Sequence, residues 1–162
     1  MMDINEIESR ASRALEVINY DPLIRIDVDS IRLARQFGFT VSEMLTLPND
    51  DDYIVTISKE KSIGVNQNQA KDDKRFAIAY AIALYLLYYE GRHMTFTGKV
   101  RDGEADAVAM AECLLMPKVP FHIYYTAVRS VSHSEKATVE NLQETFNVTQ
   151  DRARHRLELM FS

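Results

Sequence analysis

The sequence contains a single cysteine, Cys113, and only four histidines among its 162 residues. One cysteine excludes an internal disulfide and any zinc site built from several thiolates. Cys113 lies in an apolar helical pattern, where we expect an inert thiol in the core. The histidines are His93, His122, His133 and His155, and no two are three or four residues apart. One helix therefore cannot present two of them to a metal ion, and each is expected to be a surface or hydrogen-bonded histidine.

A long apolar run and an excess of basic residues are missing as well. No apolar segment follows a basic start, so no secretory signal is expected. The most apolar stretch, residues 76–89, is shorter than the roughly 20 residues that cross a bilayer, and it fits a central helix buried on all sides. The formal net charge of -5 argues against a general nucleic-acid surface. We therefore expect a cytoplasmic protein with no membrane contact, and nucleic acid is not an expected partner.

Local patterns predict a single domain over residues 1–162, without repeats, low-complexity segments or an interdomain linker. Caps, breakers and apolar periodicity predict seven helices. The second is capped by Asp27 or Asp29 and runs to Phe37, and the long central helix is capped by Asp72 or Asp73 and ends at Gly91. The other five cover residues 3–18, 102–117, 121–131, 138–146 and 149–160. Strands are predicted at residues 39–42, 53–58 and 62–66, and residues 94–100 are expected to be extended or loop.

Residues 75–88 form the most informative segment of the chain. They resemble the zinc helix of the ImmA/IrrE-type metallopeptidases, which has the form R-F-x-I-A-H-E-x-x-H-Y-L-L-H. The matching frame residues are Arg75, Phe76, Ile78, Ala79, Tyr85, Leu86 and Leu87. Residues 103–117 resemble a second family segment, E-x-E-A-N/D-x-F-A-x-x-L-L-M-P, and residues 63–74 and 139–160 resemble the family's strand-and-turn lead-in and C-terminal tail. The resemblance covers about residues 20–160.

The resemblance places Tyr80, Ala81 and Leu84 where the family has its first histidine, its glutamate and its second histidine. In the family motif the two histidines share a helix face and bind zinc, and the glutamate is the general base on the metal-bound water. Leucine has no lone pair, alanine cannot take a proton, and a phenol with a pKa near ~10 is a poor zinc ligand. The sequence therefore predicts no catalytic residues and no zinc cofactor.

Glu104 occupies the position of the family's third metal ligand, and Val108 replaces a polar residue beside it. A lone carboxylate does not hold zinc, and a carboxylate sealed in a core must be solvated, paired or protonated. We expect the Tyr80 hydroxyl to lie near Glu104, or water to fill the space between them. The alternative is that Glu104 is an ordinary first-turn glutamate favoured by the helix dipole.

The resemblance implies an α+β fold, a reduced zincin-like domain in which a short antiparallel sheet packs on a long buried central helix. It also implies a catalytically inactive metallopeptidase-like protein that acts by binding a protein partner, with a phage or mobile-element repressor as the suggested class. The expected cleft residues are Tyr80, Leu84, Tyr88, Glu104 and Val108.

Two other hypotheses stay open at the level of sequence. One is an active metallopeptidase with a non-standard metal site. The other is a DNA-binding regulator, because the helical pair at about 138–160 resembles a helix-turn-helix whose second helix carries Arg152, Arg154, His155 and Arg156.

Overall fold

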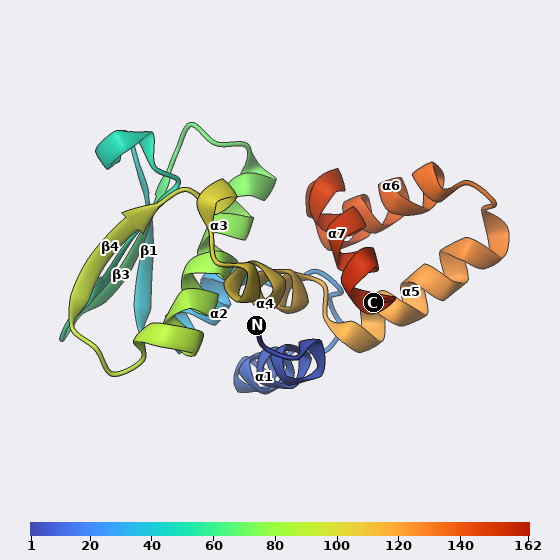
Figure 1. The fold of residues 1–162 in the computed structure, drawn as a ribbon, viewed down its shortest axis with the longest axis horizontal. Coiled ribbons are helices and arrows are strands. Elements are labelled where there is room, and N and C mark those ends of the chain that lie inside the picture. Colours follow the sequence, from blue (N-terminus) through green and yellow to red (C-terminus); the bar gives the residue numbers. More distant parts are fainter.

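The computed structural model describes all residues from Met1 to Ser162, and it is an α+β fold. The helices are α1 (Ile4–Val17), α2 (Ser30–Gln36), α3 (Lys71–Leu84), α4 (Ala105–Leu115), α5 (Lys118–Val131), α6 (Glu135–Phe146) and α7 (Gln150–Met160). The strands are β1 (Phe39–Met44), β2 (Tyr53–Ile57), β3 (Lys61–Asn66) and β4 (Met94–Gly98). Figure 1 shows the sheet at one end of the molecule and α5, α6 and α7 at the other, with α4 between them.

The sheet has the strand order β1-β3-β2-β4 and is mixed. Strand β2 pairs antiparallel with β3, as expected, and also with β4, for which the sequence predicts only an extended or loop segment. Strand β1, however, pairs parallel with β3, from Phe39 opposite Lys61 to Met44 opposite Asn66. The prediction of a wholly antiparallel sheet was therefore wrong for this pair. The β2–β3 hairpin folds back so that β3 lies between β1 and β2, and β2 with its flanking loops supplies the crossover that a parallel pair needs.

The central helix α3 is buried from Phe76 to Leu84 without a break. It packs between the sheet and α4, which leaves it no solvent face, so its apolar residues are not confined to one stripe. The sequence predicted one helix as far as Gly91, whereas α3 ends at Leu84 and a π-helical turn, Tyr85–Tyr89, follows. Gly91 has a φ of 79° and ends the segment as a left-handed residue.

The C-terminal helices form a separate arm in Figure 1, but their buried side chains belong to the same core. A single cluster of 38 buried residues runs from α1 through the sheet and α3 to α6 and α7. The predicted C-terminal pair corresponds to α6 and α7, which are joined at Asn147 in a left-handed conformation with φ 54°. No helix in the structure has the length and apolar character needed to span a membrane.

Candidate functional site

Tyr80, Ala81 and Leu84 all lie in the buried stretch of α3, and Tyr80 is only 2% exposed. The Tyr80 side chain extends from α3 to the start of α4. There its hydroxyl oxygen accepts a hydrogen bond of 3.0 Å from the backbone N–H of Glu104. The position that the resemblance assigns to the first zinc ligand is therefore a contact point between the two helices.

Two glycines make room for two tyrosine hydroxyls at this point. A Cβ atom on Gly103 would lie 2.5 Å from the Tyr80 hydroxyl, and one on Gly98 would lie 2.5 Å from the Tyr53 hydroxyl. The rings of Tyr53 and Tyr80 are 5.4 Å apart, centroid to centroid. The phenols thus fill the space between the sheet, α3 and the segment that leads from β4 into α4.

Burial raises the pKa of the Tyr80 hydroxyl, and the N–H of Glu104 opposes this shift only in part. Burial also raises the pKa of Tyr53 above its usual range. Both phenols are therefore neutral at physiological pH, whereas an oxygen that holds zinc is normally anionic or has a freely available lone pair. With alanine and leucine at the other two positions, the residues present do not supply the donor set that zinc needs.

Glu104 is the N-cap of α4, and its side chain is exposed and makes no capping hydrogen bond. The expectation that the Tyr80 hydroxyl lies near Glu104 is confirmed, but the contact is made by the backbone N–H and not by the carboxylate. The position agrees with the alternative as well, since an acidic side chain at a helix start is favoured by the helix dipole.

A surface hollow of about 440 Å³ lies beside this contact. It is lined by Leu87, Tyr88, Tyr89, Arg92 and Glu104. The structure thus brings together two of the five expected cleft residues, Tyr88 and Glu104.

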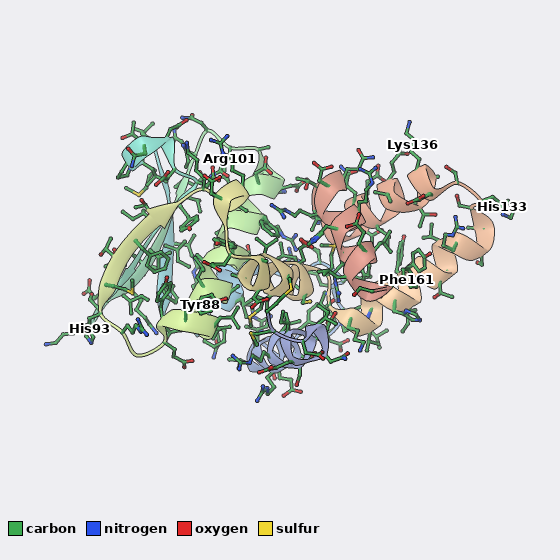
Figure 2. The ribbon with its side chains drawn as sticks, in the orientation of Figure 1. Tyr88, His93, Arg101, His133, Lys136 and Phe161 are labelled. Atoms are coloured by element: carbon green, nitrogen blue, oxygen red, sulfur yellow. The ribbon has the colours of Figure 1, made fainter.

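The remaining expected cleft residues lie deeper in the molecule. Tyr80 and Leu84 are buried, and Val108 is half-buried against the core. The exposed side of the region is formed instead by the π-helical turn. It directs Tyr85 inward against Phe39 and leaves Tyr88 at the surface, where Figure 2 labels it.

Two carboxylates, those of Asp106 and Glu104, lie near Tyr88 in the hollow. Partial burial raises the pKa of Tyr88, and the negative charges of Asp106 and Glu104 raise it further. Arg92 stacks near the Tyr89 ring, with 6.0 Å from the guanidinium carbon to the ring centroid. The hollow is therefore an aromatic surface with charges of both signs at its rim.

No group of three or more His, Cys, Asp and Glu side chains is arranged to hold a metal ion anywhere in the structure. His93, His122 and His133 are exposed, as expected. His155 is hydrogen-bonded, with its Nδ1 2.5 Å and 2.7 Å from the two carboxylate oxygens of Glu112.

The buried contacts around Glu112 were not predicted from the sequence. This residue lies in α4 and is fully buried, and both Arg152 Nη1, at 3.5 Å, and His155 Nδ1 contact its carboxylate oxygen Oε1. In the same region Arg156, which is 0% exposed, places Nη2 2.5 Å from Glu8 Oε1. A carboxylate inside the apolar run 107–116 was the available signal, because a charge buried there must find a partner.

These contacts bear on the basic residues of the helix-turn-helix-like pair. Arg152 also stacks on Phe76 at 4.1 Å, and Arg156 donates from Nε to the Met116 carbonyl at 3.0 Å. Arg154 has the most exposed side chain of the four, at 48%, and its ion-pair partner is the exposed carboxylate of Asp151 on the same helix. Three of the four side chains that a DNA contact would use are therefore bonded to other helices of the protein.

Arg75, one of the frame residues, connects three segments of the chain. Its guanidinium donates to the carbonyls of Val28, Phe146 and Asn147 at distances between 2.6 and 2.9 Å. Burial lowers the pKa of Arg75. The residue thus has a clear structural role, since it fixes the α6–α7 turn to the N-terminus of α3.

A search of curated proteins finds no match to this chain, whereas a protein-family model does match it. The family model described as the IrrE N-terminal-like domain, Peptidase_M78, matches residues 34–158, which include the whole sheet and every helix from α3 to α6. This match covers well over half of the chain, and the protein therefore belongs to the IrrE N-terminal-like (Peptidase_M78) family.

Proposed function

We propose that this chain is a catalytically inactive member of its metallopeptidase-like family and acts by binding a protein. The observation that carries the proposal is the Tyr80 hydroxyl, which accepts the Glu104 N–H at 3.0 Å in the place of the family's first ligand. A side chain that joins two helices in this way is structural. Neither Ala81 nor Leu84 offers a group that could bind a metal or move a proton.

A non-standard metal site would need donors from elsewhere in the chain. The thiol of Cys113 is buried, and burial raises its pKa well above the usual range, which opposes formation of the thiolate that binds metals. Glu104 and Asp106 lie at the start of α4, but no third His, Cys, Asp or Glu side chain joins them to form a metal-binding group. We therefore propose that the protein holds no zinc.

The hollow formed by Tyr88, Tyr89 and Glu104 is the proposed binding surface. Tyrosine and arginine are enriched at protein interfaces, and both line this hollow. Strand β4 is an edge strand of the sheet, and its Phe96 contacts Tyr89 at 4.8 Å between ring centroids. An extended segment of a partner could therefore pair with the free edge of β4 while a side chain enters the hollow.

The family suggests a cytoplasmic transcriptional repressor, of a phage or another mobile element, as the partner. A protein that has the binding surface but lacks the catalytic residues would bind such a repressor without cleaving it. Its effect would depend on occupancy, so it would scale with the concentration of the protein and not with time.

Metal analysis of the purified protein tests the inactive state. We expect substoichiometric zinc that is unaffected by Glu104→Ala, together with no cleavage of a candidate repressor. Stoichiometric zinc that disappears in Glu104→Ala would overturn the proposal. Binding is tested separately by Tyr88→Ala, which should weaken capture of the repressor, with Tyr124→Ala in α5 as a control outside the hollow.

A further inference from the structure

We propose that the outer face of α5 is a docking surface for an acidic amphipathic helix of a partner protein. This surface lies on the C-terminal arm, where Figure 1 labels α5, away from Tyr88, which Figure 2 labels in the same orientation. The inference does not depend on the proposed function.

Helix α5 has two different faces. The inner face buries Phe121 and Val128, and the Phe121 ring packs on Phe146 of α6 with 5.3 Å between centroids. On the opposite side Val119 is 65% exposed and Ile123 is 63% exposed. Large aliphatic side chains that are this exposed and one helical turn apart form an apolar strip without a partner in the chain.

The strip continues with the spacing of a helix–helix seam. Val119, Ile123, Thr126 and Ser130 follow one another at intervals of four, three and four residues, which is the heptad spacing of paired helices. The hydroxyl of Thr126 donates to the His122 carbonyl at 2.9 Å, and the hydroxyl of Ser130 donates to the Ala127 carbonyl at 2.6 Å. Because both hydroxyls are bonded to the helix itself, these residues can present their carbon atoms to a partner without leaving a polar group unsatisfied.

The charges of α5 have one sign. The helix carries Lys118 and Arg129 and no acidic residue, although the chain as a whole has a formal net charge of -5. Neither cation lies within ion-pair distance of a carboxylate in the structure. Residues 118 and 129 are three turns apart on the same side of the helix. Arg129 lies directly beside the seam, where charged residues set the choice of a helical partner, and Lys118 lies one step further from it, with its long side chain exposed.

This charge pattern selects the occupant. A second copy of α5 packed on the seam would bring lysine and arginine side chains of both copies together, and like charges across such a contact are unfavourable. A helix with apolar residues at heptad spacing and glutamate or aspartate on its flanks would bury Val119 and Ile123 and neutralise both cations. We therefore assign the surface to an acidic helix of another protein.

A synthetic peptide provides the probe. We would titrate the full ¹⁵N-labelled chain with a helical peptide that has leucine at the seam positions and glutamate on the flanks, and with the same peptide carrying lysine flanks. The glutamate peptide should bind and shift the amide signals of α5, and the lysine peptide should not bind. Absence of binding by the glutamate peptide, or equal binding of the two, would overturn the proposal.

Ile123→Asp is the decisive variant, because a side chain this exposed can be replaced without disturbing the core. It should weaken binding of the glutamate peptide about tenfold or more, the effect of losing one buried aliphatic side chain. Unchanged amide signals outside α5 verify the fold. Leu23→Asp is the matched control, since Leu23 is 95% exposed in the loop after α1, and it should leave the affinity unchanged.

The double variant Lys118→Glu, Arg129→Glu tests the charge argument. The double variant should no longer bind the glutamate peptide and should bind the lysine peptide instead. Two other results would assign the surface differently and overturn the proposal. One is a dimer of the free chain that Ile123→Asp dissociates. The other is retardation of a DNA duplex that the double variant abolishes and Ile123→Asp leaves intact.

Discussion

At the scale of single residues, Tyr80 has a structural role at the position that the resemblance assigns to a metal ligand. The phenol is long enough to reach from α3 to the segment before α4, and its oxygen satisfies a backbone N–H at a helix start, where donors lack helical partners. Gly103 accommodates the hydroxyl, because any side chain there would meet it. The apolar part of the ring fills the remaining space against Tyr53.

Removing only the hydroxyl tests this role. Tyr80→Phe should keep the ring packing but leave the Glu104 N–H without its acceptor. Loss of a buried hydrogen bond of this kind lowers the free energy of unfolding by about 1–2 kcal/mol. Urea denaturation followed by circular dichroism measures the change.

Tyr88→Phe is the control for that experiment. The Tyr88 hydroxyl makes no hydrogen bond to the protein and the side chain is 37% exposed, so its free energy of unfolding should stay within about 0.5 kcal/mol of the wild type. Equal effects of the two substitutions would show that the Tyr80 hydrogen bond does not contribute to stability.

At the scale of elements, the sequence predicted the type of nearly every helix and strand but not how two of them continue or pair. The apolar run of α3 predicts a buried helix, yet nothing local in Tyr85–Tyr89 distinguishes a π-helical turn from an α-helix. The π register places the Tyr85 ring against Phe39 and its hydroxyl 3.2 Å from Lys61 Nζ, and both partners come from the sheet. The parallel β1–β3 pair likewise depends on which strand β1 meets in the folded chain.

The α3 element offers a constructive test of the family alignment. The triple change Tyr80→His, Ala81→Glu, Leu84→His would place two imidazoles four residues apart on one helix face, next to Glu104. We expect this variant to bind one zinc ion per chain, with Glu104 as the third ligand after its exposed carboxylate turns inward. Elemental analysis and the visible spectrum of the cobalt form measure binding.

The control is the double change Tyr80→His, Ala81→Glu, which lacks the second imidazole and should bind zinc weakly or not at all. We expect the triple variant to bind metal but not to regain peptidase activity, because the apolar Val108 side chain cannot form a hydrogen bond that orients a metal ligand. A triple variant that is folded and free of zinc would count against the alignment of α3 with the zinc helix.

At the scale of the whole molecule, the arm of α5, α6 and α7 is held to the rest of the protein by buried polar contacts as well as by apolar packing. Glu112 of α4 meets Arg152 and His155 of α7, and Glu8 of α1 meets Arg156. The sequence contains an ionisable residue, Glu112, inside an apolar run, which indicates that its carboxyl group needs a partner in the core. It could not name the partner, because His155 is 43 residues away and is brought near only by the folded arrangement of the arm.

The pH dependence of stability reports whether burial or pairing dominates at Glu112. Burial is the largest influence and raises the pKa of its carboxyl above the ordinary value of 4.5, while His155, Arg152 and Arg156 act in the opposite direction. The folded chain therefore keeps a proton on Glu112 at pH values where the unfolded chain has released it. Stability from this residue is full below pH 4.5 and is lost as the pH rises through the raised value.

Glu112→Gln removes this titration, so the variant should gain stability relative to the wild type as the pH rises from about 4.5 to 7. Urea denaturation at several pH values measures the difference in the free energy of unfolding. Glu144→Gln, an exposed and unpaired position on α6, should give a difference that does not change with pH. If Glu112→Gln instead loses stability relative to the wild type with rising pH, the contacts to α7 outweigh the cost of burial. The ionised carboxylate would then be what holds the arm in place.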